Sequence, residues 1–453
     1  MWTYPLAGGT GPKYLALVDA IEQAIQTGKL QPNERLPTNR ELTQLFDVTI
    51  ATVTKAMAVA ARKGLVSAQV GSGTYVRDVA ANVETPQKTF DLALNVLPEG
   101  VVEKELLAMV QPNAQALLSR GMFGYGSYVP TAQHAQAAAG WVEAFGGPAR
   151  PEDVLLTVGV HQGLMAALHA VQGPGQHAVC EALSYTGIKR IADFLNVSLS
   201  GAECDEAGMR PDSLEQLLRQ TKARVVIVTS TLHNPTTATL PLERRKAIAG
   251  LCKKYDACLI EDGVNMPLVA SDTASVSSFA PERSIFLTGF SKCVASGFRL
   301  GYAVTPPGIK QAFHEALVST QWIGPRLYAG LAEQLLNMGA LERCIQAHRV
   351  EARFRFDLAS RILKGVRPVA TPSYHAWVDA PADQPGDSFA AHALRLGVKI
   401  SPAAHFAVSD SAAVPAAYRI SLGATQDRDE LERALHILAS MTARPPGVVS
   451  TLV

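Results

Sequence analysis

Three apolar runs in the middle of the chain each lead into a polar side chain that can do chemistry. The run VVIVTS leads to Asn234, ACLIE leads to Asp262, and SIFLTGF leads to Ser291 and Lys292. In doubly wound sheets, ligands bind beyond the carboxyl ends of the strands. If these three strands are neighbours, an amide, a carboxylate and an amine meet in one crevice, where the amine can attack a carbonyl group.

These groups meet the chemical needs of pyridoxal phosphate. A lysine can form a Schiff base with its aldehyde, and a carboxylate near the ring nitrogen keeps that nitrogen protonated. Arg299 supplies a cation for the phosphate. In VLLTVGVHQGL, the turn at Gly159 opens a helix whose Val160 and His161 N–H groups can cap a phosphate. Taken singly, each residue is more often an ordinary surface or turn position, so the residues alone leave the choice open.

The elements that position these residues form an alternating pattern from about residue 90 onward. Short β-branched runs are separated by helical stretches, which predicts a mostly parallel α/β sheet covered on both faces. After about residue 330 the pattern changes to one long helix over 331–363 and a mixed α/β tail. We therefore predict a large domain over 90–330 and a small C-terminal α/β domain over 331–453.

The first 77 residues predict a separate domain. A helical pattern over 13–27 is followed by LPTNRELTQLFDV, in which Thr38 and Glu41 form a capping box. A third helical stretch over 49–65 leads to two alternating strands around a Gly-Ser-Gly turn. Three helices and a hairpin outline a winged helix-turn-helix. Residues 78–89 lack periodicity, which is typical of a linker.

The arrangement of this first segment favours a DNA reader, although its charge is weak support. Residues 1–78 hold eight Lys/Arg and six Asp/Glu, a net of 8 − 6 = +2. A recognition helix enters the major groove with its first turn, where three threonines and a lysine cluster. On the pattern alone, a protein-interaction module remains the alternative. The candidate DNA contacts are Arg40, Thr49, Thr52, Thr54, Lys55 and Gly73.

The amino-acid composition limits which other classes of protein this chain could belong to. The chain has 453 residues, 47% hydrophobic and 18% charged, which predicts two or three domains and excludes wholesale disorder. Its net charge of +1 says nothing about polyanionic partners. The six cysteines show no zinc-ligand spacing and are expected to be reduced core thiols. The N-terminus lacks signal-peptide features and no apolar run reaches the ~18 residues of a membrane span, so we expect a cytoplasmic protein.

Two family resemblances extend this picture. The block LPTNRELTQLFDVTIATVTKAMAVAARKGLVSAQVGSGTYV resembles the GntR-type winged helix-turn-helix over its whole length, which implies binding to double-stranded operator DNA. The usual wing carries a basic residue between its glycines, whereas this chain has Ser72. Weaker wing contacts are therefore expected.

The rest of the chain, from about 92 to 440, is similar to fold-type I aminotransferases. SKCVASGFRLGY resembles their SKxxxPGxRxGY, HNPTT their NPTG, IEDG their aspartate strand and TVGVHQGL their phosphate-binding helix start. CEALSYTG and YRISLG resemble the segments that supply the ring stacked on the cofactor and the arginine that holds an α-carboxylate. The resemblance implies Lys292 as the catalytic lysine; Lys292, Asp262, Asn234, Tyr185, Arg299, Val160, His161 and Ser291 as cofactor ligands; and Arg419 and Tyr125 as effector ligands.

Several positions depart from the aminotransferase pattern. The tyrosine that usually follows the aspartate strand is absent, and Asn265 is at best a partial substitute. Gly289 stands where a phosphate-binding hydroxyl is usual, and Thr237 replaces the glycine of NPTG. YGSYVPTAQH follows the usual YGxxxG only loosely, although Tyr125 matches its tyrosine. These departures weaken the expectation of efficient turnover more than that of cofactor binding.

A GntR-type reader fused to an aminotransferase-like domain is the organisation of MocR regulators. The resemblance implies a homodimeric, pyridoxal phosphate-dependent transcriptional regulator that senses an amino acid, an amine or the cofactor itself. Two alternatives stay open: an active aminotransferase that carries a DNA-binding module, and a regulator whose degenerate pocket only dimerises.

Overall fold

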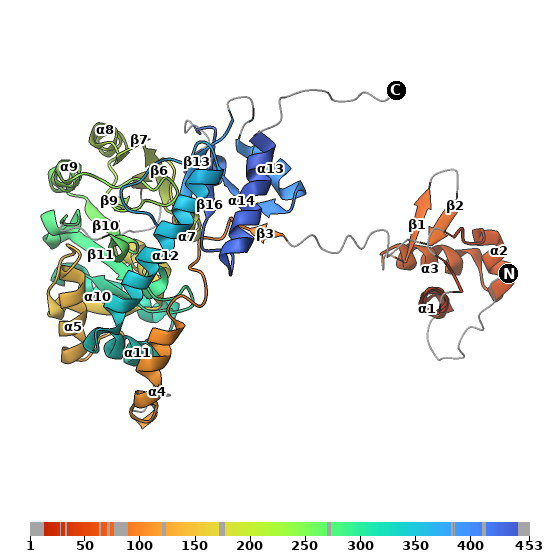
Figure 1. Ribbon diagram of the computed structural model, residues 1–453, viewed down its shortest axis with the longest axis horizontal. Coiled ribbons are helices and arrows are strands. Elements are labelled where there is room, and N and C mark those ends of the chain that lie inside the picture. The colour runs from red at the N-terminus through yellow and green to blue at the C-terminus, as the bar shows by residue number, and fades with distance from the viewer. Residues whose placement is uncertain are drawn as a thin grey trace. The chain divides into compact units, whose positions relative to one another are not determined.

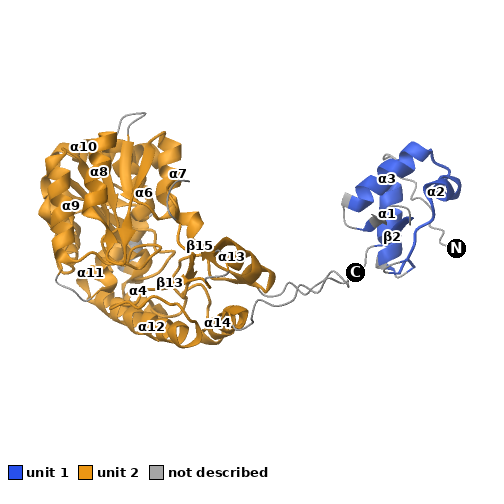
Figure 2. Ribbon diagram, turned by 90° about the horizontal axis from the view of Figure 1, so that it is seen from above, with its two compact units in different colours: residues 1–88 blue, residues 89–453 orange. Residues whose placement is uncertain are grey.

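The computed structural model divides into two compact units, residues 1–88 and 89–453 (Figure 2). The predicted linker over 78–89 lies outside the described residues except for Thr89. The predicted division of the second unit at residue 330 stays a prediction. The structure describes residues 13–27, 29–31, 34–62, 65–69, 73–76, 89–119, 124–171, 177–269, 273–381, 384, 386–409 and 414–442.

The first unit holds three helices and a hairpin around its own apolar core. The predicted capping box is confirmed, because the Glu41 N–H donates to the Thr38 hydroxyl while the Thr38 N–H donates to the Glu41 carboxylate. Asp47 ends the second helix in the left-handed region at φ 49°. The elements are α1 (Lys13–Gln26), α2 (Asn39–Phe46), α3 (Ile50–Arg62), β1 (Val66–Gln69) and β2 (Gly73–Val76).

A third segment pairs with the β-hairpin of this unit, which the sequence pattern did not indicate. β1 and β2 pair antiparallel, with Val66 opposite Val76. The N–H groups of Leu36 and Val76 exchange hydrogen bonds with the carbonyls of Thr74 and Glu34, each at 2.8 Å. Residues 34–36 therefore extend the hairpin on its β2 side. Of the predicted tip, Gly73 is described, with φ +120°, whereas Gly71 and Ser72 lie outside the described residues.

The second unit is built on a seven-stranded sheet of order β4-β12-β11-β10-β9-β5-β6. Figure 1 labels four of these strands, β6, β9, β10 and β11. The prediction of a mostly parallel sheet is confirmed, because only β12 runs antiparallel to its neighbours. The strands are β4 (Val154–Thr157), β5 (His177–Glu181), β6 (Ser198–Ala202), β9 (Val225–Val228), β10 (Cys258–Asp262), β11 (Ser284–Gly289) and β12 (Gly301–Val304).

Alternate residues of each strand face opposite cores, which is why continuous apolar runs form these strands. Along β9, Val225 and Ile227 pack in the cluster that includes α6 and α10, whereas Val226 and Val228 pack in the cluster that includes α8 and α9. Helices therefore cover both faces of the sheet. Their bounds are α4 (Glu103–Ser119), α5 (Ala132–Glu143), α6 (Gly159–Val171), α7 (Thr186–Leu195), α8 (Pro211–Thr221), α9 (Leu242–Lys254) and α10 (Pro307–Thr320).

The predicted helix over 331–363 is wrong in one respect, because two helices occupy this region. α11 (Arg326–Asn337) ends before Gly339, whose φ of +64° interrupts the helix, and α12 (Ala340–Ile362) follows. The residues after α12 form an antiparallel three-stranded sheet, and a parallel pair joins β3 to β14. The remaining strands and α-helices are β3 (Phe90–Asp91), β7 (Cys204–Asp205), β8 (Gly208–Met209), β13 (His375–Asp379), α13 (Gly386–Arg395), β14 (Val398–Lys399), β15 (Ser401–Pro402), β16 (Ala417–Ser421) and α14 (Arg428–Thr442).

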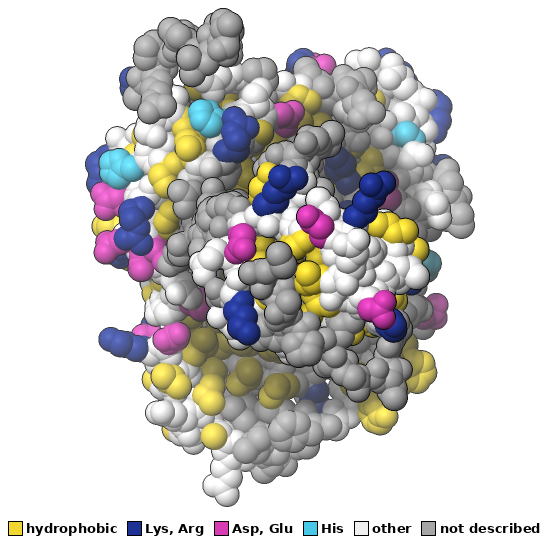
Figure 3. Space-filling view, turned by 90° about the vertical axis from the view of Figure 1, so that its right-hand side faces the viewer, with side chains coloured by type: hydrophobic (Ala, Val, Ile, Leu, Met, Phe, Trp, Pro, Cys, Tyr) yellow, Lys and Arg dark blue, Asp and Glu magenta, His cyan; other side chains and the backbone are white. Residues whose placement is uncertain are grey.

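Surface chemistry agrees with the nearly neutral composition. On the face shown in Figure 3, basic and acidic side chains are interspersed. The six cysteines are unpaired, and four of them are buried while Cys204 and Cys258 are half-buried. Within the described ranges, no cluster of His, Cys, Asp and Glu could hold a metal ion. No single described helix is long and apolar enough to cross a membrane, and the one pair that passes together, α2 with α3, is bent by 111°.

Candidate functional site

The three strands that carry the candidate residues are neighbours in the large sheet. β10 pairs in parallel with β9 on one side and with β11 on the other. Asn234, Asp262 and Lys292 therefore follow adjacent carboxyl ends, as the sequence predicted. They line one pocket of about 920 Å³. The other predicted residues that line it are Tyr185, Arg299, Val160, His161, Ser291 and Arg419.

Tyr125 is the predicted site residue that this pocket does not contain. Its side chain is 81% exposed, on the segment that a Gly126–Gly324 bridge joins to residues 322–327. Within one described chain, Tyr125 is therefore separate from the pocket.

Lys292 lies on the turn after β11 and is poised to lose its proton. Its Nζ donates to the backbone carbonyl of Asn95 at 2.5 Å. Burial and the positive charge of Arg419 lower the pKa of Lys292 from its ordinary 10.5 to about 7, although the nearby Asp262 carboxylate opposes this shift. A substantial fraction of the amine is therefore neutral at pH 7, and only the neutral form is a nucleophile.

Asp262 ends β10 with its carboxyl group inside the protein. Burial raises the pKa of Asp262 to about 6, whereas the N–H of Val264, which donates to Oδ1 at 3.1 Å, and the charge of Lys292 oppose the rise. Asp262 is thus mainly ionised above pH 6 and can hold a proton on a ring nitrogen.

The same pocket also presents donors for an anion. The Arg299 guanidinium lies against Gly159, where a Cβ would be 2.7 Å from Nη2. Gly159 has φ +75° and starts α6, so the N–H groups of the first helical turn, including those of Val160 and His161, have no partner within the helix. Among the described residues, no carboxylate forms an ion pair with Arg299. A guanidinium and a helix N-terminus together suit a phosphate.

The structure explains why position 289 is a glycine, although a phosphate-binding hydroxyl is usual there. It pairs with Gly301 between β11 and β12. A Cβ on Gly289 would lie 2.8 Å from the Leu300 carbonyl oxygen and 3.0 Å from the Gly301 Cα. The close approach of these strands therefore excludes a serine or threonine at this position.

Arg419, on β16, is a buried guanidinium whose partners in the structure are neutral. Its Nη1 donates to Asn234 Oδ1 at 2.8 Å, its Nη2 donates to the Ala93 carbonyl, and its Cζ lies 4.9 Å from the Phe406 ring centroid. Its Nε is buried without a partner among the described residues. Burial lowers the pKa of Arg419 to about 10. A carboxylate from a ligand would supply the missing counter-charge.

Two other features of the pocket bear on its chemistry. The Tyr185 ring lies edge-on to His161, with centroids 6.2 Å apart. Asn265, the partial substitute for the missing tyrosine, donates its amide to the Leu232 carbonyl at 2.9 Å. Its N–H is therefore engaged by the backbone. The carbonyls of Ala93 and Asn95 are site groups that the sequence did not indicate, because backbone atoms leave no residue signal.

The residues proposed to read DNA lie on α2, at the N-cap and in the first half of α3 and, for Gly73, at the start of β2. Thr49 caps α3, since its Oγ1 accepts the Thr52 N–H at 3.3 Å, and the Thr54 hydroxyl donates to Ile50 at 2.9 Å. Lys55 places its Nζ 4.2 Å from the Tyr14 ring centroid. Arg40, Thr49, Thr54 and Lys55 are exposed, whereas Thr52 is half-buried. The exposed Ile50, in the first turn of α3, was not among the predicted contacts.

The pocket residues fit pyridoxal phosphate. The pocket brings together a lysine of lowered pKa, a buried carboxylate, an unpaired guanidinium beside a helix N-terminus, and a tyrosine ring. The buried Nε of Arg419, which has no partner in the described parts of the chain, marks a further position for a ligand. These are the groups that this cofactor's aldehyde, ring nitrogen, phosphate and ring face require.

Comparison with known proteins identifies both parts of the chain. Residues 87–438 match the family model "Aminotransferase class I and II", and residues 13–76 match "Bacterial regulatory proteins, gntR family". A solved archaeal alanine:glyoxylate aminotransferase shares the fold, with a TM-score of 0.70 and 20% identity over 78% of this chain and 90% of its own. Pyridoxal phosphate is the cofactor of this aminotransferase class, and the pocket residues fit it.

Two regulators align along nearly the whole chain. The uncharacterized HTH-type transcriptional regulator YdeF of Bacillus subtilis is 29% identical over 96% of both chains. The HTH-type pyridoxine biosynthesis transcriptional regulator PdxR of Corynebacterium glutamicum is 25% identical over 86% of this chain and 88% of its own. The chain belongs to the class I and II aminotransferase family and, with its gntR-family domain in front, is a DNA-binding transcriptional regulator of the MocR type.

Proposed function

We propose that the pocket of this regulator holds pyridoxal phosphate on Lys292 and responds to an amino acid whose carboxylate binds Arg419. The observation that carries this proposal is the charge of the pocket. Lys292, Arg299 and Arg419 line it, and none of them forms an ion pair in the described parts of the chain. Two guanidinium cations and a partly protonated Lys292 in one pocket call for an anionic ligand.

Each residue has a distinct role in this proposal. Lys292 provides the amine that bonds the cofactor, and Asp262 holds the proton on the ring nitrogen. Arg299 and Ser291, with the first turn of α6, bind the phosphate, while Tyr185 covers one ring face. When bound, the cofactor supplies an aldehyde and an electron-accepting ring that react with amines.

A carboxylate-bearing effector is favoured over a simple amine. Arg419 is buried, and its partners are one amide oxygen and one backbone carbonyl. A buried guanidinium that lacks an anion is costly, and a ligand carboxylate relieves that cost. The Asn234 side chain, which accepts from Arg419, is positioned to contact both the effector and the cofactor ring.

Two departures from the aminotransferase pattern, at Gly289 and Asn265, favour sensing over turnover. Gly289 brings no hydroxyl to the phosphate and cannot be replaced by one without moving β12. The Asn265 amide already donates to Leu232, so it does not replace a tyrosine hydroxyl at the ring oxygen. Neither departure removes the lysine that bonds the cofactor, so binding through Lys292 is retained. Both remove contacts to the cofactor that a fast reaction would need.

A homodimer completes the proposal. Exposed apolar side chains gather around the Gly126–Gly324 bridge, on residues 125–129 and 322–327. We expect this face to join two copies, so that paired DNA readers meet two half-sites and Tyr125 serves the pocket of the other copy. A regulator of DNA acts where the DNA lies, so the cytoplasm is its expected compartment. The apolar side chains of this face are Tyr125, Val129, Trp322 and Leu327.

The absorbance spectrum of the purified protein tests the proposal. With pyridoxal phosphate added, the wild type should show a visible band that Lys292→Arg, which keeps a cation but cannot bond the aldehyde, does not show. A colourless wild type would exclude the cofactor role and leave only a dimerising scaffold. Incubation with amino acids should change the spectrum without sustained release of keto acid, whereas fast multiple turnover would show an active aminotransferase.

A further inference from the structure

Residues 92–97 form an irregular segment, here called the strap, whose ends are buried and whose middle lines the pocket. Leu92 and Leu97 are buried in separate apolar clusters. Residues 93–96 line the pocket, and the Leu94 side chain is mostly exposed. Beyond the turn at residues 92–93, no backbone–backbone hydrogen bond among the described residues holds residues 93–96. The middle of the strap is therefore held by side chains.

The side chains that hold it are two cations of the pocket. Lys292 donates to the Asn95 carbonyl at 2.5 Å, and Arg419 donates to the Ala93 carbonyl. The Ser401 hydroxyl is a weaker third contact, at 3.4 Å from the Ala93 oxygen. The strap thus uses the same donors that the proposed function gives to the cofactor and to the effector carboxylate.

A ligand competes with the strap for these donors at Lys292, and at Arg419 where a carboxylate engages Nη2. An ammonium carries three N–H groups, whereas a lysine nitrogen joined to an aldehyde carbon by a C=N bond, with release of water, keeps at most one. A carboxylate on Arg419 likewise takes guanidinium donors. A backbone carbonyl inside the protein that loses its donor is unfavourable. Occupancy of Lys292 or Arg419 therefore favours movement of the strap.

The strap follows directly on the segment that joins the two units. The first unit ends at residue 88, and β3, which pairs in parallel with β14, leads into the strap. Asp91 fastens this start: its Oδ1 accepts the Ala93 N–H at 3.0 Å, and its Oδ2 pairs with Lys399 at 3.0 Å. A change in the strap is thereby placed next to the chain that leads to the DNA reader.

We propose that the strap is the element that reports pocket occupancy to the DNA-binding unit. Ligand binding at Lys292 or Arg419 releases residues 93–96, and the released strap changes the affinity for DNA through the chain that precedes Asp91. This inference rests on the proposed function, because it assigns those two residues to ligands. It adds the route by which binding becomes regulation.

Hydrogen–deuterium exchange of the full chain, with and without pyridoxal phosphate, tests the release. The amides to follow are those of Ala93 and Leu97, which donate to Asp91 Oδ1 and, at 2.8 Å, to Ser296 Oγ. The cofactor should speed their exchange about five-fold or more, the lower end of ordinary coupling between sites. In Lys292→Arg, the cofactor should leave the exchange unchanged.

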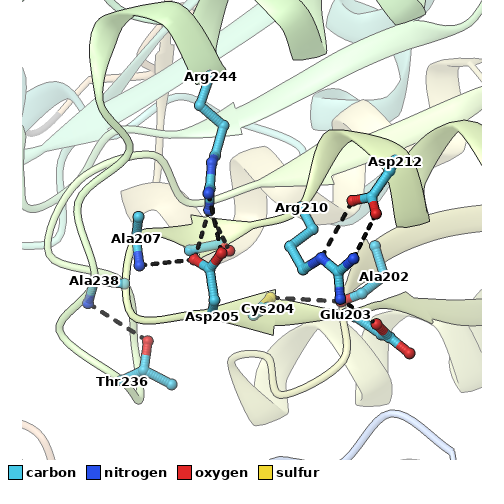
Figure 4. A network of polar contacts seen from close by, with 11 residues as sticks. Ala202, Glu203, Cys204, Asp205, Ala207, Arg210, Asp212, Thr236, Ala238 and Arg244 are labelled. Carbon is cyan, nitrogen blue, oxygen red and sulfur yellow. Dashed lines mark hydrogen bonds and ion pairs between the residues drawn. The ribbon is translucent and has the colours of Figure 1, made fainter.

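A variant outside the pocket tests the coupling to DNA, with a matched control. Asp91→Ala loosens the strap at its start, and Asp91 itself does not line the pocket. Asp205→Ala is the control, because the Asp205 side chain is 45% exposed and that of Asp91 is 44% exposed. Like Asp91, Asp205 accepts a hydrogen bond from the backbone N–H two positions later in the chain and forms an ion pair, in its case with Arg244 (Figure 4). Lys399→Ala, which removes only the ion pair, is the second variant should Asp91→Ala not fold.

The outcomes separate this inference from the proposed function. Without any ligand, Asp91→Ala should speed hydrogen exchange at the Leu97 amide. It should also change the affinity for a DNA fragment from upstream of the gene, in the same direction as pyridoxal phosphate changes the affinity of the wild type. Asp205→Ala should match the wild type in both. A visible cofactor band with unchanged strap exchange overturns the inference and leaves the proposed function standing. Faster exchange with unchanged DNA affinity overturns the coupling, and a missing band overturns both.

Discussion

The guanidinium of Arg419 donates a hydrogen bond to the side-chain oxygen of Asn234 at 2.8 Å. This contact joins a loop that follows the large sheet to a strand of the small antiparallel sheet, so the two sheets meet at the pocket. A ligand carboxylate that binds Arg419 therefore contacts both sheets at once.

Replacing Arg419 should weaken the binding of effectors that carry a carboxylate and leave the binding of simple amines unchanged. We expect Arg419→Gln to weaken amino-acid binding about 30-fold or more, since removing one partner of a buried charge pair costs about 2 kcal/mol or more. An amine without a carboxylate should bind the variant and the wild type alike. Spectral titration of the cofactor-loaded protein with an amino acid and with its decarboxylated amine measures both. Equal losses for the two ligands would contradict a carboxylate site.

Cofactor loading should depend on pH through Lys292. Because the pKa of Lys292 is lowered to about 7, the neutral amine that reacts with the aldehyde becomes the main form as pH rises through 7 rather than through 10.5. The rate of appearance of the visible band should follow this rise. Arg419→Gln removes a positive charge that lowers the pKa of Lys292, so it should move the midpoint to higher pH.

Arg367→Gln serves as the control for that shift. Arg367 pairs with Asp379 and does not line the pocket. Its variant should keep the wild-type midpoint. A wild-type midpoint near pH 10 would show that Lys292 is an ordinary solvated lysine.

Restoring the usual hydroxyl at position 289 should harm the protein. In Gly289→Ser, the new Cβ would be 2.8 Å from the Leu300 carbonyl oxygen, and overpacking of this kind typically costs about 1–3 kcal/mol. We expect a lower melting temperature and no gain in cofactor affinity. Gly297→Ser is the control, because open space surrounds Gly297. Tighter cofactor binding by a stable Gly289→Ser protein would show that β12 can yield.

The first unit should read DNA partly through Lys55. Lys55→Ala should weaken binding to all sequences by a similar factor and reduce the dependence of log affinity on log salt by about 1, as expected for the loss of one phosphate contact. Gel-shift titrations at several salt concentrations measure the slope. Lys13→Ala, exposed at the start of α1, should keep it. An unchanged slope in Lys55→Ala would place the phosphate contact elsewhere.

Self-association should depend on Trp322. This side chain is 79% exposed on the apolar face around the Gly126–Gly324 bridge, and a charge there is costly to bury against a second copy. We expect Trp322→Glu to sediment as a monomer and the wild type as a dimer. Phe194→Glu, at a residue 74% exposed on α7, should remain dimeric. A dimeric Trp322→Glu protein would move the interface to another face.

The parts of the fold that the sequence predicted depend on local patterns. The capping box at Thr38 and Glu41 and the apolar strands β9, β10 and β11 carry their signal in neighbouring residues. The break before α12 was missed because apolar periodicity continues across Gly339, and only its backbone angle ends the helix. The antiparallel β12 was missed because strand direction is set by tertiary connections.

The parts of the site that are formed by side chains could be predicted from the sequence. The residues after adjacent strand ends, Asn234, Asp262 and Lys292, line the pocket as their spacing suggested. Arg419 was indicated only by resemblance, since nothing local distinguishes it from a strand arginine. The carbonyls of Ala93 and Asn95 could not be predicted, because any residue type presents the same group and only the fold brings it to Lys292.

Helix α12 belongs to two apolar cores at once. Leu341, Cys344 and Ile345 near its start pack in the core that includes α5 and α11, whereas Phe356 and Ala359 near its end pack in the core of the small sheet. Neither core can melt without losing part of the other. Calorimetry should therefore show residues 89–442 unfolding in one cooperative transition, while the first unit, with its own core, unfolds in another.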